Sequence, residues 1–197
     1  MAEQEKGLMR GANWVRVYHA YFQAMVVEGL TSLASRTLGP EMAFNMVAEI
    51  IARGAERGFG VLVEELSKEG VSVGEMTLEE LIQYEVRCHS YARDKMGVPF
   101  QVWEEAGRDG EGRYYLYTRS CVYRDLVERN PATCAVCVGL VTGILRKAGY
   151  RAAWVSKPER MKMLCGVEEQ RRPELVVYRD PGVKLPECRL VIERLRC

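Results

Sequence analysis

The spacing of apolar and polar residues changes once along this chain of 197 residues. Up to about residue 97, apolar residues recur every three to four positions, which is the spacing of one helix face. From residue 98 on, they alternate or form short runs, interrupted by one more helical pattern near residue 140. We therefore expect a single domain in two parts: a helical part over residues 1–97, and a sheet with one further helix over residues 98–197.

Three helices are expected in the N-terminal part. The first spans residues 14–36 and has an apolar arc wider than one core contact needs, so it is either buried on two sides or placed at a dimer interface. The second begins at Pro40, since proline suits the first helical position. Its internal glycines, Gly54 among them, require close packing, a break or room for a ligand. The third begins at the capping box Thr77-Leu-Glu-Glu80.

Alternating apolar residues predict the strands of the second part. These strands cover residues 99–105, 113–119, 151–156, 174–179 and 188–194. A turn rich in glycine at residues 107–112 joins the first two into a β-hairpin. The expected fold class is α+β, with a mainly antiparallel sheet of four to five strands packed against several helices.

The remaining helix, residues 133–149, combines cysteines with glycines. Cys134 and Cys137 share one face of its first turn, where the helix dipole and free N–H groups favour a thiolate. Gly139 and Gly143 are four residues apart and leave the middle of the helix without side chains. We expect this gap to admit another backbone or a ligand.

Two further groups of residues are candidates for a ligand pocket. His89 falls on the apolar stripe of the third helix and should point inward, either as a buried histidine or as a ligand or acid/base group. Tyrosines of the hairpin either pack the sheet or form the wall of an aromatic-binding pocket. The candidate ligand-binding residues are Gly139, Gly143, Tyr115, Tyr117, His89 and Trp103.

Composition narrows the function classes. The net charge is +1, with 28 basic and 27 acidic residues interspersed, so nucleic-acid binding is not expected. The N-terminus lacks the apolar core of a signal peptide, and there is no run of 18 apolar residues. We expect a cytoplasmic protein without membrane contact. Its seven cysteines would then be thiols, ligands or catalytic groups, unless the source is a hyperthermophile.

Three segments resemble one known family. The spacing Cys134-x4-Gly139-x3-Gly143 is similar to the Cys-x4-Gly-x3-Gly helix of the 4-vinyl-reductase-type (hydrocarbon-binding) domain family. Pro186-Glu-Cys-Arg-Leu-Val-Ile192 resembles its terminal Gly-Asp-Pro-x-Cys-x-Phe strand, and Tyr115-Leu-Tyr-Thr-Arg-Ser-Cys121 resembles the strand leading into the helix. Ligand domains of phenol-responsive regulators and TRAPP-type tethering subunits belong to the same fold group.

The resemblance implies a small α/β domain, often dimeric, with an internal apolar pocket and, in several members, a cysteine-rich zinc site. Cys134 and Cys188 match the family's ligands, whereas Tyr178-Arg-Asp180 stands where its middle ligands would be. The candidate metal ligands are Cys134, Cys137, Cys165 and Cys188, with Cys121 as a further partner. Thiolates favour zinc, with an iron–sulfur cluster as the other choice. Alternatively, these cysteines are small buried apolar residues or a redox pair.

The function expected from these features is a sensor or carrier domain for an apolar or aromatic molecule. A metal or a disulfide would clamp the Cys134 helix to the Cys188 strand, and the N-terminal helices would form a homodimer. One alternative is a metal- or thiol-dependent hydrolase, similar to the aminothiazoline-carboxylate hydrolase-like family. Another is an assembly or tethering subunit. No familiar nucleophile–base motif is present, so we assign no catalytic residue.

Overall fold

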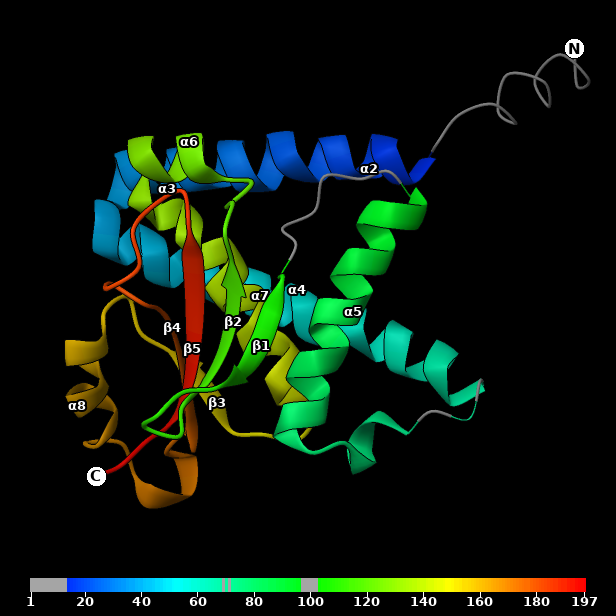
Figure 1. Cartoon of the computed structure of the whole chain (residues 1–197). Coiled ribbons are helices and arrows are strands. Elements are labelled where there is room, and N and C mark those ends of the chain that lie inside the picture. Colours follow the sequence, from blue (N-terminus) through cyan, green and yellow to red (C-terminus); the bar gives the residue numbers. More distant parts are fainter. Residues whose placement is uncertain (1–13, 69, 71, 97–102) are drawn as a thin grey trace, which may run out of the picture.

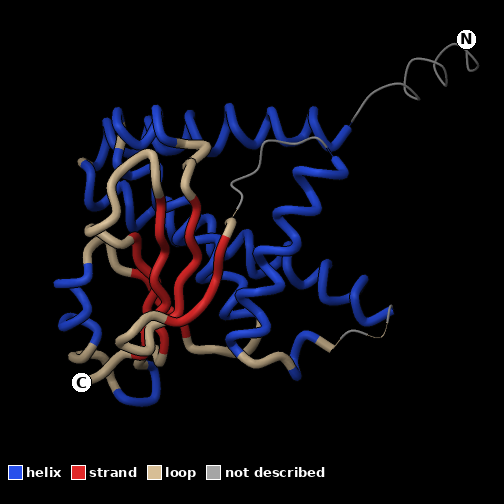
Figure 2. The backbone as a smooth tube through the Cα atoms, viewed as in Figure 1, coloured by secondary structure: helices blue, strands red, loops and turns tan. Residues whose placement is uncertain are grey.

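The computed structural model describes residues 14–68, 70, 72–96 and 103–197 (Figure 1). It contains one five-stranded sheet in the order β1-β2-β5-β4-β3, surrounded by helices (Figure 2). The strands are β1 Glu105–Arg108, β2 Tyr114–Thr118, β3 Ala152–Trp154, β4 Leu175–Arg179 and β5 Cys188–Arg194. All neighbouring strands are antiparallel except β3 and β4, which are parallel. The expected α+β class with a mainly antiparallel sheet is confirmed.

The helices follow the predicted order. The long ones are α2 Trp14–Phe22, η1 Gln23–Leu30, α3 Thr31–Leu38, α4 Pro40–Lys68, α5 Leu78–Met96 and α7 Cys134–Lys147. The short ones are η2 Val73–Glu75, α6 Arg124–Arg129, η3 Pro131–Thr133, η4 Pro158–Arg160, α8 Met161–Leu164 and η5 Glu169–Arg171. In Figure 1, α2, η1 and α3 form one helix across the top of the molecule, and α5 lies beside β1. None of the helices within the described ranges is both long and apolar enough to cross a membrane.

The start of α5 confirms the capping box. The Thr77 N–H donates to Glu80 Oε2 at 2.8 Å, and the Glu80 N–H donates to Thr77 Oγ1 at 3.2 Å. These reciprocal bonds satisfy two N–H groups that the first helical turn leaves unpaired. At its middle, α5 is attached to the sheet, because Gln83 Nε2 donates to the Ala106 carbonyl oxygen at 2.8 Å.

The first helix differs from the expectation in its middle turns. Its predicted range, 14–36, is helical, but η1 is a π-helix between two α-helical parts. A π-helical turn holds more residues than an α-helical turn and is frequent at functional sites. The apolar stripe is therefore rotated along this helix, and η1 has a buried residue, Val27, facing the core.

The first strand of the hairpin extends further than predicted. Residues 99–102 of the expected first strand lie outside the described residues, and β1 covers Glu105–Arg108 instead, entering the predicted turn. The cause is Asp109, whose Oδ1 accepts N–H bonds from Glu111 and Arg113 at 3.0 and 2.9 Å. An aspartate side chain that bonds its own backbone in this way fixes a tight turn directly after it.

Helices α4 and α7 run parallel and form the closest helix contact in the fold. A Cβ on Gly139 would lie 2.5 Å from the Ala48 carbonyl oxygen, and one on Gly143 would clash with the Ala52 carbonyl and lie 2.7 Å from Ala55 Cβ. The backbone of α4 therefore occupies the gap that the glycines leave. Of the two options stated for these glycines, another backbone or a ligand, the first is the correct one.

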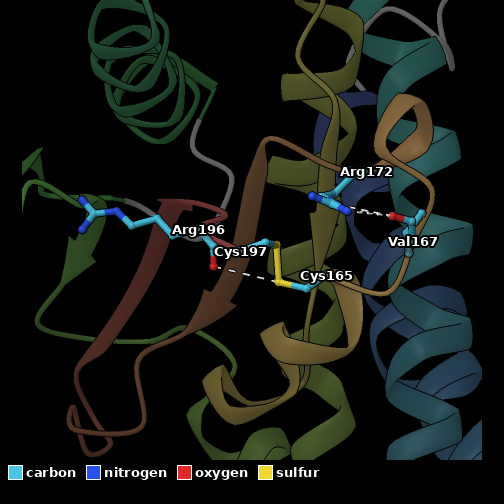
Figure 3. The surroundings of a disulfide bond; sticks show 5 residues. All are labelled: Cys165, Val167, Arg172, Arg196 and Cys197. Carbon is cyan, nitrogen blue, oxygen red and sulfur yellow. Dashed lines mark hydrogen bonds between the residues drawn. A yellow bond between two sulfur atoms is a disulfide. The ribbon is translucent and has the colours of Figure 1, made fainter.

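The two faces of the sheet are covered differently. Side chains on one face of the sheet, such as Leu116 and Ile192, belong to the main core, which lies under α4 and α7. Val155, Val176, Tyr178 and Val191 form a smaller cluster on the opposite face, packed against Met161, Leu164 and Leu195. A disulfide between Cys165 and Cys197 attaches the segment of α8 to the C-terminus beside this cluster (Figure 3).

Candidate functional site

A cavity of about 570 Å³ lies between the first helix, α4, α5 and α7. Its walls are almost entirely apolar: Val26 and Leu30 come from η1, Ile51 from α4, and Val136 and Leu140 from α7. The volume falls within the range of about 300–1,000 Å³ that is usual for small-molecule sites. The cavity can therefore hold a molecule of the size of a substituted benzene or larger.

Local features of three helices explain why a hollow forms here. Val136 and Leu140 are four residues apart and share one face of α7, adjacent to the face on which Gly139 contacts α4. Gly54 of α4 also lines the cavity, and a Cβ at this position would meet no atom within 4 Å. Among the reasons considered for Gly54, close packing is therefore wrong, and it contributes open space instead.

Polar side chains are few among the lining residues. His89 Nε2 lies 2.9 Å from Glu85 Oε1 one turn earlier on α5, and these side chains are only 16% and 10% exposed. Trp103 is 1% exposed, and within the described ranges its indole N–H has no hydrogen-bond partner. An unpaired buried N–H costs about 1–3 kcal/mol, so such groups are rare without a partner. Trp103 lines the cavity, so a donor that lacks an acceptor in the described ranges belongs to its wall.

Tyr123 is another polar side chain of the wall. Burial raises the pKa of its phenol well above the ordinary value, although a hydrogen bond with Gln23 opposes the shift. The phenol is therefore neutral at physiological pH and can donate or accept a hydrogen bond. With His89 and Trp103, it gives the apolar cavity three side chains able to hydrogen-bond a ligand.

The candidate ligand-binding residues divide into two groups. His89 and Trp103 line the cavity, and the expected inward direction of His89 agrees with its position there. The other four, Gly139, Gly143, Tyr115 and Tyr117, are not among its lining residues. The glycines contact α4, as described above.

The tyrosines are engaged on the sheet. Tyr115 lies against Gly107 of the neighbouring strand, and the Arg189 guanidinium is 4.4 Å from its ring centroid. The phenol of Tyr117 is hydrogen-bonded to Glu187, which raises its pKa. The packing interpretation of these tyrosines is the one that their contacts favour.

Sequence reasoning missed most of the cavity wall. Val26 and Leu30 belong to the apolar stripe of the first helix, but the π-helix that places them is not visible in a spacing pattern. Tyr123 lies in a link between the hairpin and α7 that had no regular pattern. The one available signal was Gly54, a glycine inside a long helix without an evident backbone need.

Four cysteines from three segments of the chain gather at the start of α7. Cys121, Cys134, Cys137 and Cys188 are free thiols, and they are near enough for their charges to influence one another. Cys188 donates a hydrogen bond to Cys121, which lowers the pKa of Cys121 and, together with burial, raises the pKa of Cys188. The Cys134 helix and the Cys188 strand therefore do approach each other through their thiols.

The first-turn cysteines of α7 do not behave as the helix dipole alone would suggest. Burial raises the pKa of Cys134 to about 11 and that of Cys137 well above 9. The desolvation cost of a thiolate outweighs the stabilisation by the helix N-terminus, which is of the order of 1 kcal/mol. Both groups are neutral thiols at pH 7, so the expectation of a thiolate at this helix start is wrong.

Cys165 is not a partner of the other thiols. It forms the disulfide with Cys197, and its Sγ lies 3.9 Å from the Arg196 carbonyl oxygen (Figure 3). The assignment of Cys165 as a metal ligand is therefore wrong, because its sulfur is already bonded. The segment that carries it packs on the face of the sheet opposite α7.

A metal site at the remaining thiols stays a prediction. Throughout the described part of the chain, no group of three or more His, Cys, Asp or Glu side chains is placed to hold a metal ion. The raised pKa values of Cys134 and Cys137 describe the metal-free protein, because a bound metal ion would itself ionise a ligating thiol.

Comparison with known proteins adds no assignment: the sequence matches no family model, and no similar curated protein is found. The resemblance to the 4-vinyl-reductase-type family consequently stays an expectation from motifs. The function has to be argued from the cavity and its residues.

Proposed function

We propose that this chain binds a small, mainly apolar molecule in the cavity between the first helix, α4, α5 and α7, and acts as a sensor or carrier domain. The observation that carries the proposal is the buried Trp103 N–H, without a partner in the described ranges, on the wall of an apolar cavity of about 570 Å³. A ligand with an apolar body and one hydrogen-bond acceptor would fill the space and satisfy this donor.

The chemistry of the walls limits what could bind. Val26, Ile51 and Leu140 offer no hydrogen bonds, so a strongly polar ligand would lose its hydration without compensation. The polar atoms of Trp103, His89 and Tyr123 can bond a single carbonyl or hydroxyl group. An aromatic ketone or phenol meets these conditions better than a sugar or an amino acid.

Acetophenone and ethylbenzene test the proposal, because they have similar size and differ in the acceptor. Titration into the purified chain, followed by tryptophan fluorescence and calorimetry, should give saturable binding of both, with acetophenone tighter. Leu140→Trp fills the cavity and should abolish binding. Val61→Trp, at a position 60% exposed on α4, is the matched control. Equal binding by wild type and Leu140→Trp would refute the proposal.

A second proposal concerns the first helix, for which assembly or homodimer formation was expected. Tyr18, Tyr21, Met25 and Leu33 are 68%, 60%, 67% and 59% exposed. Such a set of apolar residues on one helix is a typical interaction surface. We propose a homodimer through this helix. Met25→Glu should then shift sedimentation from dimer to monomer, whereas Val61→Glu should leave the dimer intact. A wild-type monomer at all concentrations would reject it.

The hydrolase alternative requires an acid/base group beside a cysteine thiolate, and a pairing of His89 with Cys134 is not favoured. Its two candidate groups lie apart, because His89 lines the apolar cavity and Cys134 lines a different one. Cys134 is also protonated at neutral pH, with a pKa of about 11, and a thiol in that state is a poor nucleophile.

A further inference from the structure

A second cavity, of about 810 Å³, lies at the carboxyl ends of the parallel strands β3 and β4. It is walled by Ser156 and Lys157 after β3, by Arg179 and Pro181 at the end of β4, and by the start of α7. In sheets with parallel strands, the crevice outside the carboxyl ends is the usual place for a ligand. This site is separate from the apolar cavity, with which it shares no lining residue.

Two long helices begin at this cavity. Helices α4 and α7 run parallel, since Gly139 meets Ala48 and Gly143 meets Ala52, and both have their first residues among the lining. Each helix start carries the equivalent of about half a positive charge. At α7, the helix continues from η3, and the Asn130 side chain caps this start by accepting a hydrogen bond from the Ala132 N–H at 3.2 Å. Both helix dipoles therefore favour negative charge in the same space.

Arg179, which lines the cavity, has an N–H donor without an acceptor in the described ranges. Arg179 uses one terminal nitrogen to donate to the Val183 carbonyl oxygen at 2.8 Å. Its Nε atom is buried and has no acceptor within the described ranges. A buried guanidinium N–H is expected to have a partner, and Arg179 points to an anionic one because a guanidinium bonds carboxylate and phosphate oxygens in pairs. This observation is independent of the helix dipoles.

The balance of charge also favours an anion. Three cations line the cavity, Lys157, Arg160 and Arg179, against two carboxylates, Glu41 and Glu159. Arg160 and Glu41 neutralise each other through an ion pair of 2.8 Å. Among the residues that line the cavity, Arg179 and the exposed Lys157 then face one carboxylate, Glu159, which is also exposed.

The rest of the wall is apolar. Phe44 of α4 and Val127 of α6 are both 7% exposed, and Pro131 lies beside them. A bare inorganic ion would leave this surface in contact with water. An organic body attached to the anionic head would cover it and gain the free energy of apolar burial.

We propose that this cavity binds a small organic anion, whose carboxylate or phosphate head contacts Arg179, Lys157 and the start of α7 and whose apolar body lies against Phe44 and Val127. The site would give the domain a second ligand, chemically different from the molecule in the apolar cavity. The proposal does not depend on the first site being a sensor.

Calorimetric titration with phenyl phosphate, benzoate, inorganic phosphate and neutral benzamide tests this site. One of the two aromatic anions should bind at least about tenfold more tightly than benzamide and inorganic phosphate, and the stronger one identifies the head group. Equal binding of benzamide and both anions, or binding of inorganic phosphate alone, would overturn the proposal.

Variants locate the binding. Arg179→Gln and Lys157→Gln should each weaken binding of the preferred anion, with Arg179→Gln costing about tenfold or more. Arg151→Gln, at the opposite end of β3, and Lys162→Gln, on α8, are the matched controls and should bind as wild type does. Leu140→Trp, which fills the apolar cavity, should also leave anion binding unchanged. Loss in the controls, or no loss in Lys157→Gln and Arg179→Gln, would reject this location.

A second readout applies if Arg179→Gln fails to fold. Cys134 lines the same cavity, so the preferred anion should slow its modification by N-ethylmaleimide, measured by peptide mass spectrometry, in wild type and not in Lys157→Gln. Cys88, on α5 and outside this cavity, should show unchanged modification in the same samples. Equal modification of Cys134 with and without the anion would contradict the proposal.

Discussion

Gly139 lies against Ala48 so closely that a Cβ on the glycine would be 2.5 Å from the alanine carbonyl oxygen. Four residues later, Gly143 makes the same kind of contact with Ala52. The two glycines therefore set the distance and direction of α7 relative to α4. Because α7 also carries Val136 and Leu140, this contact positions one wall of the apolar cavity as well as the start of the helix at the anion cavity.

Replacement of Gly143 by alanine should destabilise the fold. The added methyl group meets backbone and Ala55 Cβ, which cannot rotate away, so we expect a loss of about 1–3 kcal/mol. Gly58→Ala is the control, since a Cβ there meets nothing within 4 Å and alanine should stabilise α4 by about 0.5–1 kcal/mol. Urea unfolding followed by circular dichroism measures both. A stability of Gly143→Ala equal to wild type would contradict the close helix contact.

Reduction of the Cys165–Cys197 disulfide should also destabilise the protein. The bond joins residues 32 positions apart, and closing such a loop in the unfolded chain corresponds to about 3–4 kcal/mol in the chain-entropy model. Urea unfolding with and without a reductant measures the effect. Wild type should lose stability on reduction and Cys165→Ser should not respond. Cys88→Ser keeps the disulfide and should lose stability on reduction as wild type does. If Cys165→Ser lost as much stability on reduction as these two proteins, the result would count against the disulfide.

The elements of the fold could be predicted where the signal is local. Pro40 and the capping box at Thr77 and Glu80 mark helix starts by their own chemistry, and both starts are confirmed. The last two strands follow from their short apolar runs, which are typical of strands covered on both faces of a sheet. The first strand of the hairpin was misplaced because the Asp109 side chain, rather than the glycines, decides where the turn begins.

The site was only partly predictable, because its geometry depends on contacts between distant segments. The inward direction of His89 follows from the stripe on its own helix. By contrast, the spacing of the glycines did not show which of them pack and which leave space. Gly139 packs against α4, and Gly54 leaves open space at the cavity. The partner of Cys165 is 32 residues away and depends on how the α8 segment folds back. In the sequence, Arg179 is an ordinary residue at the end of a strand. Its role depends on the parallel strand β3, which places Lys157 at the same cavity.

The Trp103→Phe variant should weaken binding of ligands that carry a hydrogen-bond acceptor and leave binding of the others nearly unchanged. Phenylalanine keeps most of the apolar surface and removes the indole N–H that has no partner in the described residues. Acetophenone should bind about tenfold more weakly to the variant, because a hydrogen bond in a dry site is lost, whereas ethylbenzene should bind nearly as to wild type. Calorimetry measures both affinities. An equal loss for both ligands would mean that Trp103 contributes shape alone.

The neutral thiol of Cys134 predicts how stability depends on pH. Burial raises its pKa from 9.0 to about 11 in the folded protein, so above pH 9 the unfolded chain loses this proton first. The contribution of the neutral group is complete below pH 9 and is lost as the pH rises to 11, by about 2–3 kcal/mol. Cys137 shifts in the same direction and adds to the effect.

Urea unfolding of wild type and Cys134→Ala between pH 7 and pH 11 tests this dependence. The variant has a smaller side chain at a half-buried position, so it should be less stable at pH 7. Since alanine has no proton to lose, the difference between the two proteins should shrink as the pH rises and disappear or reverse near pH 11. Two curves that remain parallel over this range would show that the Cys134 thiol ionises as readily in the folded chain as in the unfolded one.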